Sequence, residues 1–140
     1  IGASLLRVAG GGISDKLGGW TTAVGSLALA LLGAVVVALA PAGVFTVVGL
    51  ILMAIGMGVG NAAVFKLVPQ FVPKAVGGAA GWIGGLGAFG GFVIPLGLVA
   101  VLNAAGYAEG FWIFAALFAL SIGSLTLLRR SEAALAFAKE

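Results

Sequence analysis

The charged residues of this chain are so sparse that they leave three long stretches without formal charge, and this spacing restricts the fold more than any other feature. The stretches cover residues 17–65, 75–108 and 110–128. A helix that crosses the hydrocarbon core of a bilayer needs about 20 mainly apolar residues. The first stretch is long enough for two such helices, with a break at Pro41 and Gly43. Each of the other two is long enough for one.

The overall composition excludes a soluble domain. Charged residues make up 8% of the chain and apolar residues 62%, whereas about a quarter of the residues in soluble domains are charged. Too few polar side chains remain to cover a water-exposed surface. The sequence therefore predicts an all-α membrane protein over residues 1–140. Its four complete transmembrane helices are expected at about 21–40, 44–65, 77–102 and 111–128, after the end of a fifth at about 1–12.

The residue types needed for most enzyme chemistry are missing. The chain has no cysteine and no histidine, which excludes disulfides, thiolate metal sites and the commonest general base. The acids are far apart in sequence and fall at the ends of predicted helices or in the tail: Asp15, Glu109, Glu132 and Glu140. We therefore predict that the protein is not an enzyme and binds no metal and no organic cofactor.

The basic residues alternate between the predicted links. The links at 41–43 and 103–110 contain no lysine or arginine. The other links and the tail contain Lys16, Lys66, Lys74, Arg129, Arg130 and Lys139. Because basic residues collect on the cytoplasmic side of a membrane, the pattern predicts a multi-pass protein with a cytoplasmic C-terminus. The same pattern accounts for the pI of about 9.8, so the lipid bilayer is the expected partner rather than nucleic acid.

Glycine is frequent, at 25 residues, and it falls inside the predicted helices. At 3.6 residues per turn, small residues form one stripe on the second complete helix and another on the third. The first stripe consists of Gly49, Gly56, Gly60 and Ala63, and the second of Gly77, Gly81, Gly84, Ala88, Gly91 and Pro95. Small residues let helix backbones approach closely in lipid. Both stripes therefore predict lengthwise contact with a neighbouring helix.

A short polar motif lies between the first two predicted helices. It consists of Gly12, Asp15, Lys16, Gly18 and Gly19, and it resembles the cytoplasmic loop signature of the major facilitator superfamily. That signature occurs between the second and third helices and between the eighth and ninth, and four helices following it here match the later copy. The resemblance implies the C-terminal half of a 12-helix transporter and a conformational role for the loop. The alternative is an ordinary polar turn.

Two further runs resemble the nitrate/nitrite porter family within that superfamily. The run 58–70 reads Gly-Asn-Ala-x-Val-Phe-Lys-x-Val-Pro-Gln from residue 60, and it is similar to the tenth helix and the loop after it. The glycine-dense run 77–95 ends Gly-Gly-Phe-x-x-Pro, similar to the second nitrate signature. The resemblance implies transport of nitrate, nitrite or both across the cytoplasmic (inner) membrane by alternating access of two halves. Proton symport and nitrate/nitrite antiport both remain open.

Arg7 lies about two helical turns before Asp15, inside a predicted helix. A cation at that depth is costly unless it faces a wet cavity or a partner. The resemblance implies that Arg7 binds the anion together with an arginine from the N-terminal half, which this chain lacks. The chain has Val8 where many relatives have proline. The alternative is an arginine that extends to the cytoplasmic interface.

The resemblance implies further residues along the route of the anion. They are Asn61, Gly87, Gly90 and Gly91 as substrate-binding residues, and Phe89 and Phe92 as pore-lining residues. Glycine lets a small anion approach the backbone closely. An interhelical hydrogen bond is the alternative role for Asn61, and contact with lipid or neighbouring helices is the alternative for the two phenylalanines.

Two other functions are compatible with the sequence. The first is transport of a different small anion or an organic solute, because Arg7 suits any monoanion. The second is a non-transporting membrane scaffold. The scaffold alternative predicts a start codon just upstream of Ile1, whereas the transporter interpretation predicts about six to eight further helices there.

Overall fold

The computed structural model describes residues 10–12, 14–40, 42–104 and 106–137. Its long helices are α2 (Gly19–Leu39), α3 (Val44–Phe71), α4 (Val76–Ala104) and α5 (Tyr107–Phe137). Residues 10–12 and 14–17 are also helical, and no strand occurs among the residues described. All 4 long helices are long and apolar enough to cross a membrane. This confirms the prediction of an all-α membrane protein.

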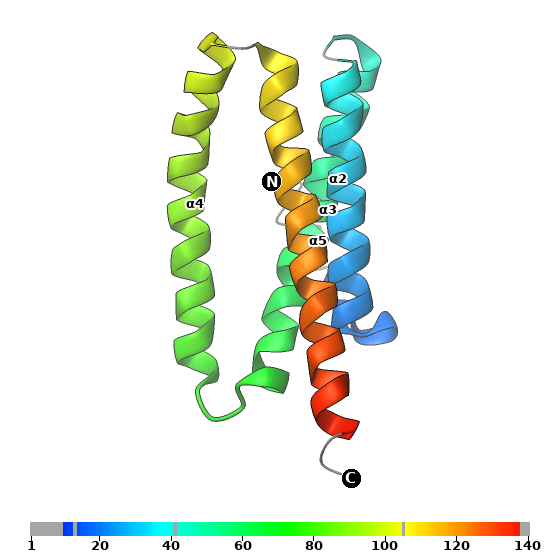
Figure 1. Ribbon diagram of the computed structural model, residues 1–140, viewed down its shortest axis with the longest axis vertical. Helices are drawn as coiled ribbons and strands as arrows, with labels where there is room; N and C mark the ends of the chain where they lie inside the picture. Colours follow the sequence, from blue (N-terminus) through cyan, green and yellow to red (C-terminus); the bar gives the residue numbers. More distant parts are fainter. Residues whose placement is uncertain (1–9, 13, 41, 105, 138–140) are drawn as a thin grey trace.

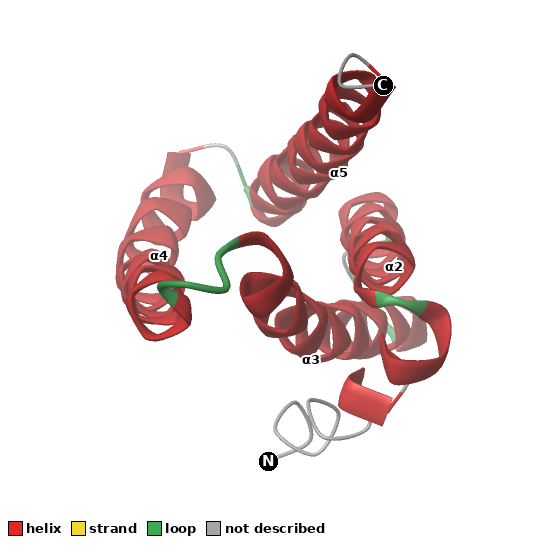
Figure 2. Cartoon of the chain, turned by 90° about the horizontal axis from the view of Figure 1, so that it is seen from below, coloured by secondary structure: helices red, strands yellow, loops and turns green. Residues whose placement is uncertain are grey.

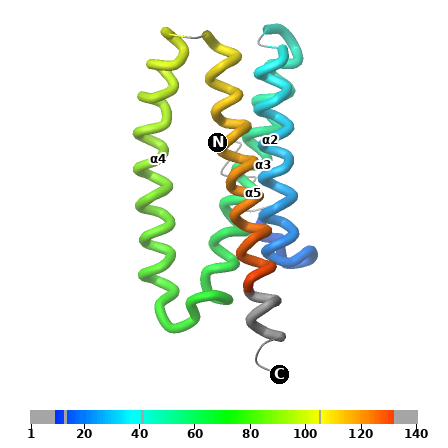
Figure 3. The backbone as a smooth tube through the Cα atoms, viewed as in Figure 1, coloured from blue at the N-terminus to red at the C-terminus, as the bar shows by residue number. Residues whose placement is uncertain are grey.

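The long helices stand side by side and alternate in direction (Figure 1). The α2–α3 and α4–α5 turns lie at one end, and the α3–α4 loop lies at the other with the start of α2 (Figure 3). Helix α5 ends on the same side as this loop (Figure 1). Viewed along the bundle, α4 stands apart from α2 (Figure 2). Helix α2 packs along α3 and against α5, whereas α4 makes fewer contacts, to α3 and α5.

Glycines form the closest helix contact, between α2 and α3. A Cβ atom built on Gly33 would lie 2.5 Å from the carbonyl oxygen of Gly49 and 2.7 Å from the backbone nitrogen of Met53. A Cβ atom on Gly56 would lie 2.5 Å from the carbonyl oxygen of Ser26. These neighbours are backbone atoms, so they cannot rotate away. The predicted lengthwise contact of the α3 stripe is therefore confirmed.

The glycine stripe on α4 behaves differently. A Cβ atom on Gly77, Gly81, Gly84 or Gly91 would meet nothing within 4 Å, and no residue of α4 is buried. The tight contact predicted for this stripe is not made within the part of the chain that the structure describes. The reason is that α4 has only its few contacts with α3 and α5 there.

Helix α3 is longer than predicted. It continues to Phe71, beyond the predicted end at residue 65, so the polar connection expected at 66–76 is reduced to residues 72–75. The continuation keeps a buried face, because Leu67 and Val68 are only 7% and 5% exposed. The burial of these two side chains favours continuing the helix. It offsets the cost of the backbone hydrogen bond that is lost because Pro69 has no N–H.

Helix α5 also extends past both of its predicted ends at 111 and 128. It begins at Tyr107, whose ring lies 5.8 Å from that of Phe111, and Glu109 in its first turn suits the positive end of a helix dipole. At the other end, two arginines do not stop the helix, which runs to Phe137. The stretch that is apolar enough to cross a membrane ends at Ser131, whereas the helix continues to Phe137.

The predicted link between the first two helices is shorter than expected. Residues 14–17 are helical and α2 begins at Gly19, rather than at residue 21. The chain turns at Gly18, which has φ 83°, a conformation that glycine adopts without the cost of a Cβ clash. Within residues 14–39, Gly18 is the one residue outside helical geometry.

Candidate functional site

A cavity of about 310 Å³ lies between all four long helices and contains two of the predicted substrate-binding residues. Asn61 lines it from α3 and Gly87 from α4. The rest of the lining is mainly apolar: Ala23, Leu27, Ala30, Gly56, Met57, Gly60, Val64, Phe65, Ile83, Phe118 and Leu125. A mainly apolar cavity with a single side-chain amide is suited to a small solute held by few polar contacts.

The amide of Asn61 is the chemically distinctive group of this cavity. Its Oδ1 atom is buried and has no hydrogen-bond partner among the residues that the structure describes. Close contact between α2 and α3 fixes the position of Asn61, because Gly56 and Gly60 of α3 pack against Ser26 of α2. Asn61 follows Gly60 in the sequence and points about 100° away from it around the helix. An unpaired buried polar group costs about 1–3 kcal/mol. Because Oδ1 is an acceptor, it favours a partner that donates a hydrogen bond, whereas an anion can bond only to the two N–H donors of this amide.

The other predicted site residues on α4 do not line this cavity. Gly87 is the predicted residue of α4 that lines the cavity, and a Cβ atom built on it would meet nothing within 4 Å. Gly90 and Gly91 lie about one turn further along the helix. Phe89 and Phe92 are 65% and 68% exposed. The structure therefore brings Asn61 and Gly87 together and leaves the four residues at 89–92 outside the cavity. The remaining predicted site residue, Arg7, lies outside the described residues.

The predicted loop motif has an ionic partner that the sequence analysis missed. The Lys66 ammonium donates to the carboxylate of Asp15, although Lys66 was interpreted as an orientation charge only. No sequence signal pointed to this pair, because the two residues are 51 positions apart and their meeting depends on how far α3 extends. Gly12 and Lys16 are exposed. Asp15 thus connects the motif to α3.

Two apolar contacts support this ion pair from α2. A Cβ atom on Gly19 would lie 2.7 Å from a methyl group of Leu67. The rings of Trp20 and Phe71 meet edge to face, with centroids 5.7 Å apart. We call these three contacts, including Asp15–Lys66, the α2–α3 junction. It fixes the end of α3 against the start of α2.

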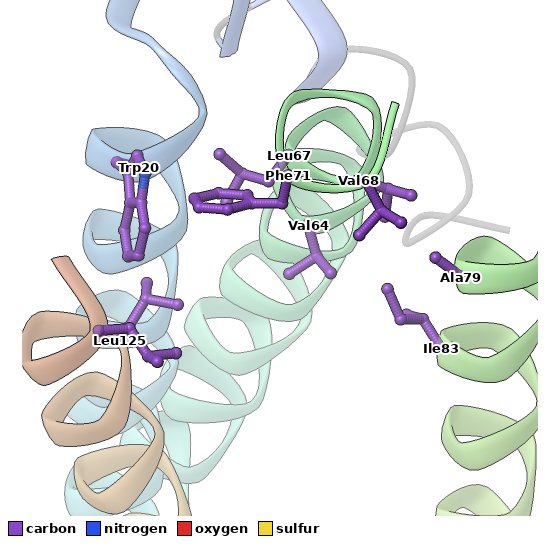
Figure 4. Close-up of a pocket in the computed structure, with 10 residues that line it drawn as sticks. Trp20, Val64, Leu67, Val68, Phe71, Ala79, Ile83 and Leu125 are labelled. Atoms are coloured by element: carbon purple, nitrogen blue, oxygen red, sulfur yellow. The ribbon is translucent and has the colours of Figure 1, made fainter. Parts of the chain in front are cut away.

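The α2–α3 junction borders a second, apolar cavity of about 280 Å³. Figure 4 shows Trp20 and Phe71 above this space, with Ile83 of α4 facing it from the other side. Its lining offers no side-chain charge. This cavity therefore provides no charged group for binding an anion.

The ion pair of the junction gives a first prediction. In a double-mutant cycle of Asp15→Asn and Lys66→Gln, we expect a coupling energy of about 0.2–1 kcal/mol, because the Asp15 side chain is 73% exposed and exposed pairs are weak. Thermal unfolding of the purified protein in detergent measures it. The matched cycle of Asp15→Asn with Lys16→Gln should give no coupling. Equal coupling in both cycles would contradict a specific Asp15–Lys66 contact.

The described basic side chains all gather at one end of the bundle. Lys16 precedes α2, Lys66 and Lys74 lie at the end of α3 and in the next loop, and Arg129 and Arg130 lie toward the end of α5 (Figure 1). The opposite end, among the same described residues, contains Glu109 and no lysine or arginine. We call the first of these the basic end.

Comparisons with known proteins identify the relatives of the chain. It is 32% identical to a probable nitrate transporter NarT of Staphylococcus carnosus over 96% of its own length. It is 38% identical over 78% of its length to a nitrite extrusion protein of Bacillus subtilis. It is 39% identical over 66% of its length to a probable nitrate/nitrite antiporter NarK1 of Thermus thermophilus. This chain belongs to the nitrate/nitrite porter family.

The chain corresponds to only part of these porters. It spans 35% of the length of the Staphylococcus relative, 28% of the Bacillus relative and 25% of the Thermus relative. These proportions agree with the prediction of a segment of a larger transporter. No family model and no solved structure matches the chain. All three porters are named for transport rather than for an enzymatic reaction.

Proposed function

We propose that the chain forms the C-terminal transmembrane half of a major facilitator transporter that moves nitrate, nitrite or both across the cytoplasmic membrane. Alternating access of two halves around a midplane site is the proposed mechanism. The observation that carries the proposal is that Asn61 and Gly87, on two different helices, line the same mainly apolar cavity. The names of the relatives, each of which refers to nitrate or nitrite, support the choice of anion.

The chemistry of the cavity suits a small planar anion. The side-chain amide of Asn61 has two N–H donors, which can bond to nitrate or nitrite oxygens. Gly87 leaves space on the opposite wall. Apolar walls strengthen each polar contact by excluding water. Neutral amide donors do not balance a full charge, so we assign that role to Arg7, whose planar guanidinium can bond two oxygens at once.

The proposed orientation places the basic end in the cytoplasm. Lysine and arginine collect on the cytoplasmic side of membrane proteins, and the described basic side chains lie at one end of the bundle. The end of α5 lies there too. The C-terminus is then cytoplasmic, and Asn61, about three turns from the end of α3, lies inside the cytoplasmic half of the membrane.

Asn61→Leu tests whether the amide acts on the solute or on the fold. The full-length transporter is expressed in cells that lack their own porters, and uptake of labelled nitrate is measured at equal membrane abundance. We expect uptake to fall about tenfold or more, because a hydrogen bond to a charged group contributes about 1.5–3 kcal/mol. We expect thermal stability to be unchanged or higher, since an unpaired buried polar group is removed.

The control is Met57→Leu, which lines the same cavity and keeps its volume and polarity. It should retain uptake. Loss of stability together with uptake in Asn61→Leu would instead assign Asn61 to an interhelical hydrogen bond. Unchanged uptake in a well-inserted Asn61→Leu protein would remove Asn61 from the site. Uptake of neither nitrate nor nitrite by the wild type would contradict the assigned substrate.

A further inference from the structure

A groove with a polar end and an apolar end lies at the basic end, between the first turns of α2 and the last membrane-spanning turns of α5. It has a volume of about 340 Å³. Its lining comprises Trp20, Thr21, Val24 and Gly25 from α2 and Thr126 and Arg129 from α5. None of these residues lines the cavity that contains Asn61. The groove therefore needs an explanation separate from the solute path.

The lining of this groove changes from charged to apolar along the helices. Arg129 supplies a guanidinium at the basic end, and the exposed Thr21 supplies a hydroxyl beside it. One turn further into the membrane, the lining consists of Val24 and Gly25 of α2 and Thr126 of α5. The Thr126 hydroxyl already donates to the carbonyl oxygen of Gly123. A Cβ atom on Gly25 would meet nothing within 4 Å, so the deeper part of the groove is unfilled by this chain's described residues.

Charge around the groove favours an anionic ligand. Arg130 and Lys16 add positive charge at the same end. The one acid there with a described side chain, Asp15, already contacts Lys66. Arginine is well suited to phosphate because its planar fork donates two parallel hydrogen bonds. Trp20 is of the residue type that gathers at the membrane–water interface.

We propose that this groove binds an anionic phospholipid of the cytoplasmic leaflet. Arg129 contacts the lipid phosphate, Thr21 donates a hydrogen bond to it, and an acyl chain lies along Val24 and Gly25. A soluble anion would leave the apolar part of the groove empty, whereas a lipid matches both parts. The lipid then links α2 to α5 beside the α2–α3 junction. The proposal rests on the orientation proposed above, and it does not depend on which solute is transported.

Native mass spectrometry of the full-length protein in detergent tests the proposal. The probes are dioleoylphosphatidylglycerol and, as the zwitterionic comparison, dioleoylphosphatidylethanolamine. We expect phosphatidylglycerol to bind more tightly, and Arg129→Gln to weaken its binding about fivefold, because one basic residue near the surface contributes that much attraction. The matched control is Arg130→Gln, which removes the same charge from the neighbouring exposed residue outside the groove. It should leave binding nearly unchanged.

A second variant tests the apolar part of the groove. Gly25→Leu adds no charge and meets no neighbour close to its Cβ position, so the fold should tolerate it while the acyl chain is displaced. We expect phosphatidylglycerol binding to fall as in Arg129→Gln. Equal weakening by Arg129→Gln and Arg130→Gln, equal binding of the two lipids, or unchanged binding in Gly25→Leu would each overturn the proposal. Lipid binding is measured without nitrate, so a failure of the proposed transport function would not affect the result.

Discussion

Replacing Gly33 by alanine should force α2 away from α3 and destabilise the protein by about 1–3 kcal/mol, the usual cost of overpacking. The added methyl group would lie 2.5 Å from the carbonyl oxygen of Gly49 and 2.7 Å from the backbone nitrogen of Met53. Both atoms belong to the backbone of α3, so the clash can be relieved only by moving a whole helix. Because lipid provides no hydrophobic drive for helix association, close packing has to supply much of the stability of this pair.

Thermal unfolding of the purified full-length protein in detergent measures the effect. The matched control is Gly25→Ala on the same helix, where the new methyl group would meet nothing within 4 Å. Gly25→Ala should leave the unfolding temperature unchanged or raise it, since alanine favours helix more than glycine does. If both variants unfold at the same temperature as the wild type, the close α2–α3 contact does not exist in the protein.

Replacing Arg7 by lysine should reduce nitrate uptake roughly 10- to 100-fold, if Arg7 forms the proposed anion clamp. Lysine keeps the positive charge but loses the planar fork that bonds two oxygens together. A charge-assisted hydrogen bond contributes about 1.5–3 kcal/mol, which corresponds to this range. Uptake of labelled nitrate by the full-length transporter, in cells without their own porters and at equal membrane abundance, measures the loss.

Lys16→Arg is the control for this experiment, because it exchanges the same two residue types at an exposed position of the loop motif. It should retain uptake. If Arg7→Lys also retains uptake, Arg7 is an interface residue and the bidentate clamp is rejected, while nitrate remains the solute. If uptake is lost but nitrite or another monoanion is still carried by Arg7→Lys, the guanidinium selects between anions rather than binding them all.

The sequence by itself determined that the chain folds as membrane-spanning helices, and it predicted the four long helices that the described residues contain. The predicted end of a fifth helix at about 1–12 lies mostly outside the described residues. Lipid cannot satisfy backbone hydrogen bonds, so each apolar stretch has to bond within itself as a helix. The spacing of charges therefore sufficed to separate the helices and to place Lys74 and Arg129 at one end. The α3 stripe of Gly49 and Gly56 was equally predictable, because helical periodicity alone places these residues on one face.

Only the tertiary structure decided where the helices end and which residues meet. Helix α3 continues past Lys66 because Leu67 finds a buried place against Gly19 of α2, and no local pattern specifies that neighbour. The same applies to the Asp15–Lys66 pair. The family resemblance of the sequence implied Asn61 and Gly87 as separate substrate-binding residues. The cavity that both residues line depends on how α3 and α4 are placed. Contacts between residues far apart in the chain follow from helix packing, which composition and periodicity do not encode.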